Sequence, residues 1–444
     1  MSDRWDVAIV GAGPAGCAAA LGALRARPDA RVLLIDAAAF PRDKVCGDGI
    51  APHALDVLTE LGVDHDELVE GCAPITRLRL CAPGGSIASR PMTRTGFVVP
   101  RAVFDERLVR AAVAAGAVLR RHTVRRLRVG HDEVELDDGS VASVVIGADG
   151  AESVVRRAAL AQSPEPGTIA PARSRGSHTM GSAGSPEPGT IALAGSPGSG
   201  TTASARPPRS DATASAGSPG SGTIVGSGAA TSAQPPRSGT MALAIRGYAP
   251  ADPWPAGEQL LRMTATNWPA YAWVFPIGDG RANVGYGEIL RDTPLTRAHL
   301  EQRLRDLLPD ARPTQLRAHR LPLSTGRLPV GHGRVLLAGD AAALINPLTG
   351  EGIFYAVASG ALAGAAAVGP DPATTYARTF RARLGRHLRH TDVAAALTRT
   401  PKMINAAVAA SARDQHTFDA FVDLGLGDGL LTARGLLRTA RHLF

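Results

Sequence analysis

The segment Asp6-Val7-Ala8-Ile9-Val10-Gly11-Ala12-Gly13-Pro14-Ala15-Gly16 decides the fold of the N-terminal part of this chain. An apolar run leads into the pattern Gly-x-Gly-x-x-Gly, which is followed by an alanine-rich stretch and a second apolar run ending in Asp36. This order predicts a strand, a tight turn, a helix and a second strand, the elements of a βαβ unit. Gly11 permits the turn, Gly13 lets a pyrophosphate approach the backbone, and Gly16 lets the helix pack on the sheet. We therefore predict a dinucleotide site.

The flanks of this turn agree with that prediction. The helix that opens at Pro14 and Ala15 would present unpaired N–H groups to phosphates. Asp36 ends the second strand, where its carboxylate can accept hydrogen bonds from the hydroxyls of a ribose and disfavours a 2′-phosphate.

Two further motifs favour FAD over NAD as the dinucleotide. Gly147-Ala148-Asp149-Gly150 ends a Val-Val-Ile strand, and Gly339-Asp340 ends a second buried strand that leads to a glycine-rich helix start at 346–353. A carboxylate at a strand end can bind a ribityl hydroxyl, and helix N–H groups can stabilise negative charge on a flavin ring. Motifs spread over most of the chain suit a long, extended FAD. The predicted cofactor contacts here are Asp149, Gly339, Asp340, Gly350, Gly352 and Ile353.

The chain has 444 residues, enough for two or three domains. Short alternating strands separated by turns follow residue 241 and predict an antiparallel sheet. We predict an α/β fold with a Rossmann-type, glutathione-reductase-like FAD-binding domain, an antiparallel β-sheet substrate domain and a C-terminal helical segment. The predicted boundaries are 1–75, 95–160 and 321–370 for the FAD-binding domain, 76–94 and 241–320 for the sheet domain, and 371–444 for the helices.

Residues 161–240 form a low-complexity insertion rich in Gly, Ser, Pro, Thr and Ala. Ser-Pro-Glu-Pro-Gly-Thr-Ile-Ala occurs at 163–170 and again at 185–192. The repeat has no apolar face at the period of a helix or a strand, so it cannot build a core. We expect a disordered, tandemly duplicated surface insertion, with a flexible arm for partner docking as the alternative.

Three sequence runs resemble the geranylgeranyl reductase family. They are Phe40-Pro-Arg-Asp-Lys-Val-Cys-Gly-Asp-Gly49, Pro269-Ala-Tyr-Ala-Trp-Val-Phe-Pro276, and the segment from Gly339-Asp340 to Gly352-Ile353. The resemblance covers roughly 1–160 and 241–400, whereas the family pattern lacks the insertion. The wider group includes aromatic hydroxylases and flavin halogenases, which share the motifs around Asp149 and Asp340.

The resemblance implies roles for specific residues. The flavin ring would face the β-sheet domain, with Arg101, Cys46 and Gly47 at the cofactor and the substrate between the domains. Apart from the resemblance, Lys44, one of only two lysines, is a candidate to pair with the FAD phosphates. Tyr271, Trp273, Phe275 and Pro347 would line a pocket for an elongated apolar substrate, and strand alternation alone puts 271, 273 and 275 on one face. Catalytic candidates are Cys46, Tyr271 and Trp273. The alternatives are a small buried thiol at Cys46, plain core aromatics, and a Lys44 that does not touch the cofactor.

The family resemblance implies a reductase of carbon–carbon double bonds in a prenyl or other apolar substrate. An FAD-dependent monooxygenase or oxidase of natural-product biosynthesis is the first alternative, because fold does not settle function. A non-catalytic flavin-binding scaffold is the second. Halogenation is disfavoured, because flavin halogenases use a lysine between the cofactor and aromatic motifs and this chain has no lysine between 45 and 401. NAD(P)H or ferredoxin would donate electrons transiently, because no separate NAD(P) domain is evident. Glu351, beside the flavin, is a candidate to donate or relay protons.

Composition limits the partners. Net charge is +8, and residues 376–444 hold most of this excess, without the mixture of arginine and aromatic residues that single-stranded nucleic acid binding uses. No nucleic acid is expected. The segment from 429 is basic and amphipathic, so it either rests on an anionic membrane or docks on its own domain. The four cysteines lack metal-ligand spacing. We expect a cytoplasmic protein, peripheral to a membrane in the first case; its oligomeric state is not predicted.

Overall fold

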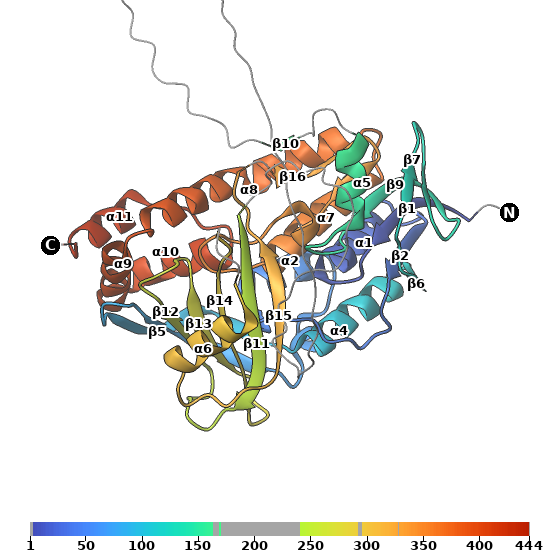
Figure 1. The fold of residues 1–444 in the computed structure, drawn as a ribbon. Helices are drawn as coiled ribbons and strands as arrows, with labels where there is room; N and C mark the ends of the chain where they lie inside the picture. The colour runs from blue at the N-terminus through green and yellow to red at the C-terminus, as the bar shows by residue number, and fades with distance from the viewer. Residues whose placement is uncertain (1–2, 163–167, 170–239, 292–294, 327, 444) are drawn as a thin grey trace, which may run out of the picture. The chain divides into compact units, whose positions relative to one another are not determined.

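The computed structural model describes residues 3–162, 168–169, 240–291, 295–326 and 328–443. Within them, two large β-sheets are surrounded by helices, and the C-terminal helices lie together at the end of the chain drawn in red (Figure 1). This arrangement is the mixed α/β architecture that the sequence predicts.

The first sheet contains the dinucleotide motif. Its strand order is β17-β18-β9-β1-β2-β6, and β7 and β8 extend it as an antiparallel hairpin beside β9. Strands β6, β2, β1, β9 and β18 are parallel. Val7, Ala8 and Ile9 have no exposed surface, as expected for a central parallel strand. The strands are β1 (Arg4–Val10), β2 (Val32–Asp36), β6 (Val118–Arg121), β7 (Leu127–Val129), β8 (Val134–Leu136), β9 (Val141–Gly147), β17 (Gly331–His332) and β18 (Val335–Leu337).

Helices α1 (Pro14–Ala26) and α7 (Ile353–Ala367) pack against each other at very short range. A Cβ on Gly360 would lie 2.2 Å from the carbonyl oxygen of Ala15, and one on Gly364 would lie 1.9 Å from that of Ala19. Small residues on both helices therefore bring the N-terminal turn and the 346–353 motif side by side. The other helices of this part are α2 (Pro52–Glu60), α3 (His65–Val69), α4 (Arg101–Ala114) and α5 (Val154–Gln162).

The second sheet has the order β15-β11-β14-β13-β12-β4-β5-β3. Its pairs are antiparallel except β12 with β4, where the two parts of the chain that form the sheet meet. Residues 73–75 and 95–98, which the sequence reading assigns to the first domain, belong to its strands because β4 and β5 pair along most of their length. The strands are β3 (Gly49–Ile50), β4 (Ala73–Cys81), β5 (Ile87–Val98), β11 (Met241–Pro250), β12 (Glu258–Met263), β13 (Tyr271–Pro276), β14 (Arg281–Ile289) and β15 (Thr314–Pro322).

The two faces of this sheet differ. One face carries α6 (Arg297–Leu307), and Leu300 and Leu304 of this helix are buried in a core with Tyr286. The opposite face of β13 lines the cavity described below.

Four helices complete the chain: α8 (Pro372–Leu397), α9 (Pro401–Arg413), α10 (Gln415–Leu426) and α11 (Ala433–Ala440). Arg90 of β5 fixes the end of α9 by donating hydrogen bonds to the carbonyls of Ser411 and Ala412, each at 2.6 Å. The C-terminal helices thus close over one edge of the second sheet (Figure 1). Short elements between the sheets are β16 (Leu328–Pro329) and a 3-10 turn at Gly339–Ala342.

The predicted insertion lies largely outside the described residues. Of its span, 161–162 end α5, and 168–169 form β10 (Thr168–Ile169), which pairs with β16. The disorder expected of the remainder therefore stays a prediction. Among the helices described, none combines the length and the apolar character needed to cross a membrane.

Candidate active site

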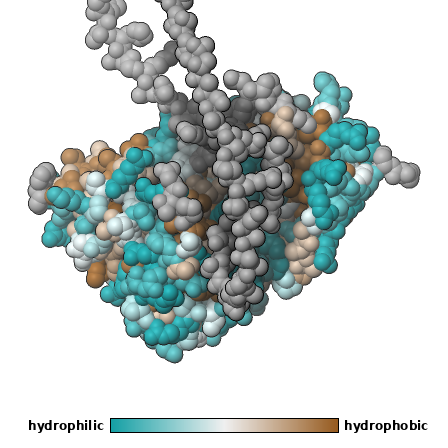
Figure 2. All heavy atoms as spheres, in the orientation of Figure 1, coloured by the Kyte–Doolittle hydropathy of each residue, from teal (hydrophilic) through white to brown (hydrophobic). Residues whose placement is uncertain are grey.

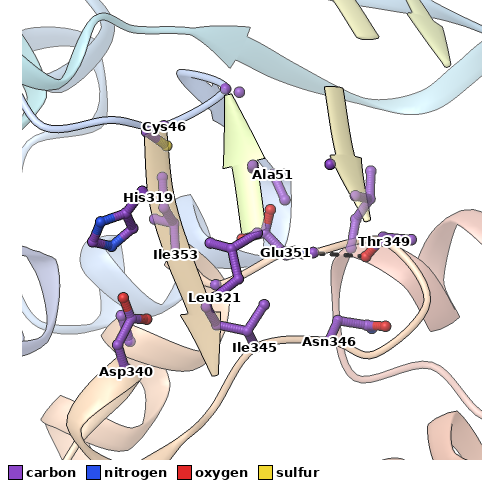
Figure 3. Close-up of a pocket in the computed structure, with 18 of the residues that line it drawn as sticks. Cys46, Ala51, His319, Leu321, Asp340, Ile345, Asn346, Thr349, Glu351 and Ile353 are labelled. Atoms are coloured by element: carbon purple, nitrogen blue, oxygen red, sulfur yellow. Dashed lines mark hydrogen bonds between the residues drawn. The ribbon is translucent and has the colours of Figure 1, made fainter. Parts of the chain in front are cut away.

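A cavity of about 750 Å³ lies between the two sheets and continues to helices α8, α9 and α10. Figure 3 shows part of its wall, where Glu351 and Ile353 point into the same space as Leu321 and Ile345. All of the predicted cofactor and pocket residues line this cavity except Gly16 and Gly339. Those that do are Gly11, Gly13, Pro14, Ala15, Asp36, Lys44, Cys46, Gly47, Arg101, Asp149, Tyr271, Trp273, Phe275, Asp340, Pro347, Gly350, Gly352 and Ile353.

The glycine turn leaves backbone exposed at one end of the cavity. Gly11 has φ +101°, and a Cβ there would lie 2.3 Å from the carbonyl oxygen of Ala148. Gly13 is the N-cap of α1 and supplies no side chain to the helix N–H groups, so these are free for an anion. The carboxylate of Asp36 accepts a hydrogen bond from the Ala12 N–H at 2.9 Å and lines the cavity beside the turn. Pyrophosphate and ribose fit here.

The two predicted glycines that do not line the cavity are packing positions. A Cβ on Gly16 would lie 1.8 Å from the carbonyl oxygen of Gly11. Gly339 has φ +57°, and a Cβ there would lie 3.0 Å from the Cβ of Ala15. Both act by letting the motifs approach one another.

Two arginines stand beside the turn, and the sequence reading named only one of them as a contact. Arg101 is buried and forms a bidentate pair with Asp105, with both N–O distances at 2.7 Å. This carboxylate raises the pKa of Arg101, and the guanidinium stays charged. Arg42 lies 2.8 Å from Asp105 and 3.6 Å from Asp36, close to where a Cβ on Gly13 would sit. Arg42 could have been found from the sequence, because it lies within the family-like run 40–49.

The predicted ribityl region holds three polar side chains. Lys44 Nζ lies 3.7 Å from the carboxylate of Asp340. His319 of β15 also lines the cavity, its Nε2 is buried without a partner among the described residues, and burial lowers its pKa. Asp340 and His319 lie on the same side of the view in Figure 3. His319 was not predicted as a site residue, because a single histidine in a strand has no distinguishing sequence pattern.

The carboxylate of Asp149 is already engaged. It accepts hydrogen bonds from Ser153 Oγ at 2.5 Å and from the Val154 N–H at 2.7 Å, which is the geometry of a helix cap. Asp149 lines the cavity, but its side chain holds the start of α5.

The 43–49 loop is clamped by buried side chains of the second sheet. Arg246 of β11 donates to the carbonyl of Cys46 at 3.1 Å and to the carboxylate of Asp43 at 2.7 Å. Asn283 of β14 donates to Asp48 and to the same Cys46 carbonyl, each at 2.8 Å. These side chains lie far from the loop in sequence, so no local pattern revealed them. They fix Cys46 and Gly47 against the cavity.

The Cys46 thiol itself is poorly suited to act as a nucleophile. Burial raises its pKa, which disfavours the thiolate that such chemistry requires. Its Sγ accepts a hydrogen bond from the Asp48 N–H at 3.4 Å.

The aromatic strand forms one wall of the cavity. Tyr271, Trp273 and Phe275 lie on one face of β13, as alternation predicts. Trp273 Nε1 donates to Asn283 at 2.9 Å, and the Tyr271 hydroxyl donates to the carbonyl of Thr349. Because both polar groups are occupied, these residues shape the wall instead of offering a free proton donor.

The 346–352 loop is held from two sides. Asn346 Nδ2 donates to the carbonyls of Leu424 and Gly425 at 3.0 and 3.2 Å and to the Tyr355 hydroxyl at 3.1 Å. Thr349 Oγ1 adds a bond to the Gly425 carbonyl at 2.6 Å. The end of α10 therefore fixes the loop that opens α7. Gly350 has φ +68°, and a Cβ there would lie 3.1 Å from the Tyr271 hydroxyl.

The far end of the cavity is apolar and was missed by sequence reasoning, except for its aromatic wall. It is lined by strands β4, β5 and β12 and by helices α9 and α10. Its lining there includes Leu78, Leu80, Met92, Leu261, Met263, Ile404, Ala407, Val408, Phe421 and Val422. Apolar side chains spread singly over five elements leave no motif.

These features together fit FAD in an extended conformation. Asp36 suits the ribose, the N-terminus of α1 with Arg42 and Arg101 suits the pyrophosphate, and Asp340 suits the ribityl chain. The glycine-rich start of α7 offers N–H groups to a flat ring. The fold is that of a glutathione-reductase-like flavoprotein.

Comparison with known proteins leads to the same class. Residues 4–187 match the family described as "FAD binding domain". Digeranylgeranylglycerophospholipid reductase 1 of Methanopyrus kandleri is 30% identical over 414 residues, which cover 87% of this chain and 88% of that protein. Menaquinone reductase of Mycobacterium tuberculosis (strain H37Rv) is 29% identical over 409 residues, 87% of this chain and 82% of that protein.

A solved structure agrees over the full length. A geranylgeranyl bacteriochlorophyll reductase-like protein from Thermoplasma acidophilum matches with a TM-score of 0.67 and 19% identity, covering 99% of this chain and 96% of that one. The chain belongs to the geranylgeranyl reductase family of FAD-dependent oxidoreductases. The predicted family, fold class and cofactor are thereby confirmed.

Proposed function

We propose that this enzyme saturates carbon–carbon double bonds in a prenyl chain or another elongated apolar substrate. The observation that carries the proposal is the single cavity that joins the FAD motifs to an apolar end between the second sheet and the C-terminal helices. A polar cofactor end and a long apolar end suit a linear apolar substrate whose reacting bond lies beside the 346–352 loop. The named substrates of the relatives, a quinone and a geranylgeranyl lipid, support the same class.

The protein would orient the substrate, exclude water from the reacting bond and supply protons. Reduced FAD, when bound, supplies a hydride to one carbon of the double bond. The wall of Tyr271, Trp273 and Phe275 would hold the chain flat against the cofactor side of the cavity. The clamped 43–49 and 346–352 loops would keep the reacting bond in place. Cys46, a half-buried thiol with a raised pKa, would pack against the substrate without forming a covalent bond. Lys44 would sit beside Asp340 at the ribityl chain and not at the phosphates.

The substrate class also bears on where the enzyme works. Val393 and Leu397 of α8 and Leu436 and Leu437 of α11 are exposed, with Leu437 at 64%. Figure 2 shows apolar surface over these helices beside hydrophilic residues. Exposed Arg434 adds positive charge. We propose a cytoplasmic enzyme whose C-terminal helices rest on an anionic membrane, from which the apolar substrate enters. NAD(P)H or ferredoxin would reduce the flavin transiently.

The test is anaerobic photoreduction of the purified holoenzyme, followed by mixing with a prenylated quinone or prenyl lipid under argon and mass spectrometry of the product. We expect flavin reoxidation together with a gain of two hydrogens per bond saturated. If the flavin instead reacts with oxygen to accumulate a long-lived C4a adduct and oxygenates a substrate, the enzyme is a monooxygenase. If the flavin stays reduced with every prenyl substrate and with oxygen, the scaffold alternative is favoured.

A further inference from the structure

Saturating a double bond requires a proton as well as a hydride, and one half-buried carboxyl lines the cavity where a proton is needed. Glu351 is within the loop that opens α7, and its side chain points into the cavity (Figure 3). Its Oε1 accepts a hydrogen bond from the Phe354 N–H at 2.8 Å. Burial raises the pKa of Glu351 to about 7, so a substantial share of the carboxyl is protonated near neutral pH. A general acid works best with a pKa near the working pH.

A histidine packs against the first turn of the same helix. His53 of α2 lies edge-on to Phe354, with ring centroids 6.1 Å apart and an interplanar angle of 71°. Its ring also packs against Gly427, where a Cβ would lie 2.5 Å from the ring carbons. A positive charge on His53 would lower the pKa of the Glu351 carboxyl.

The two ring nitrogens of His53 have different surroundings. Nδ1 is buried and has no hydrogen-bond partner among the described residues. Nε2 lies 3.3 Å from the carboxylate of Asp423 on α10, and the Asp423 side chain is 48% exposed. One nitrogen thus faces the protein interior, and the other contacts a carboxylate in solvent. A buried ring nitrogen without a hydrogen-bond partner costs free energy, unless a water molecule or another ligand binds it.

We propose that Asp423, His53 and Glu351 form the path that brings protons from solvent to the substrate. The proposal rests on the proposed function. The hydride adds to one carbon and oxidises the reduced FAD; the O–H bond of Glu351 breaks and a C–H bond forms at the other carbon. The Glu351 carboxylate then takes a proton from His53, directly or through one water, and Asp423 passes the replacement from solvent to His53. Glu351 is the catalytic acid, and His53 and Asp423 act through it.

The other ionisable groups around Glu351 are neutral at physiological pH and do not compete. Tyr271 faces it from β13, Cys46 from the 43–49 loop, and Tyr355 from its own helix. Burial raises the pKa of each of these three groups. Among the described groups that act on the Glu351 pKa, His53 is therefore the one that also contacts a carboxylate open to solvent, that of Asp423.

The test compares wild-type holoenzyme with Glu351→Gln, His53→Ala and His65→Ala. His65 on α3 is an exposed histidine beside Asp66 and serves as the matched control. We expect Glu351→Gln to lower the single-turnover rate of alkene reduction by about 100-fold, and His53→Ala by about tenfold. Added imidazole should rescue His53→Ala but not Glu351→Gln. Flavin reduction by the electron donor and alkene reduction should both be unchanged in His65→Ala. Wild-type rates in both site variants would overturn the path and leave the function standing.

A second readout needs no substrate. Infrared titration of the oxidised holoenzyme should show a carboxylic acid band that disappears near pH 7 and is absent in Glu351→Gln. Because His53 lowers the Glu351 pKa, His53→Ala should shift this titration to higher pH, while His65→Ala should not. An unshifted titration in His53→Ala overturns the path even if no alkene is reduced. Failure of the wild type to saturate any prenyl substrate, with the shift present, counts against the proposed function alone.

Discussion

The two ends of the cavity recognise their ligands by different means. At the dinucleotide end the backbone makes the surface, with Gly11 in the left-handed region and α1 opening without a side-chain cap. At the far end side chains make it, drawn from β4, β5, β12 and the C-terminal helices. A backbone surface allows few residue types, whereas an apolar surface can be built from many. The first end should therefore tolerate few substitutions, and the second end should tolerate many.

The sharpest way to break this comparison is Gly13→Val at the dinucleotide end. A Cβ on Gly13 would meet only the ends of Arg42 and Arg101, at 3.5 and 3.8 Å, so the chain should still fold. The added side chain would keep pyrophosphate from the backbone, and we expect FAD affinity to fall at least ~100-fold, or about 3 kcal/mol. Flavin absorbance per protein measures this. Gly369→Ala, at a helix end, is the control, and a fully yellow Gly13→Val protein would refute the assignment.

The next effect concerns the 346–352 loop, which the bonds of Asn346 fix to α10; we call this contact the joint between the two ends. Asn346→Ala removes the donor shared by two α10 carbonyls and the Tyr355 hydroxyl. Because these acceptors lie buried, we expect the free energy of unfolding to fall by about 2–3 kcal/mol. Denaturant unfolding measures the change. Asn405→Ala, at an exposed bond to the Gly84 N–H, should cost less than ~1 kcal/mol. Equal losses in the two variants would show that the joint has no special weight.

At the far end, Ala407→Trp sharpens the comparison by changing substrate length without touching FAD. Ala407 lines the cavity, and its neighbour Ala409 on the same helix does not. We expect turnover of long prenyl chains to fall about tenfold, with short chains and FAD content unaffected, because a filled slot costs ~1–3 kcal/mol. Product analysis over a series of chain lengths is the measurement, with Ala409→Trp as control. An equal loss for all lengths would place the substrate elsewhere.

The smallest expected effect is at the surface beyond the cavity. Leu437→Ser removes an exposed apolar side chain from α11, and partial insertion of a leucine into a membrane is worth ~1 kcal/mol. Binding to anionic vesicles in a sedimentation assay should weaken about fivefold. Leu119→Ser, at an exposed leucine on β6 of the first sheet, should bind as the wild type does. No vesicle binding by the wild type would remove the membrane proposal.

The sequence predicted what backbone geometry dictates. The βαβ turn, the strand ends at Asp36 and Asp340 and the shared face of β13 could be read from glycine spacing and alternation. Residues that act over long sequence separations could not. Arg246 and Asn283 bond to Cys46 of the 43–49 loop from positions 200 and 237 residues later, and nothing local marks them. Asp149 shows a second limit of sequence analysis. The motif correctly placed this residue at the cavity, but could not show that its carboxylate caps a helix.

The bonds from Asn346 to Leu424 and Gly425 also set the order of events during synthesis. The acceptors follow the donor by 78 and 79 residues, and a ribosome delivers the N-terminal side first. The 346–352 loop cannot reach its described geometry until α10 has emerged. The glycine turn depends on late residues as well, because α7 packs against α1. Completion of the site is therefore a late event in the life of each new chain, and a nascent chain stopped before 424 would lack the bonds that hold this loop.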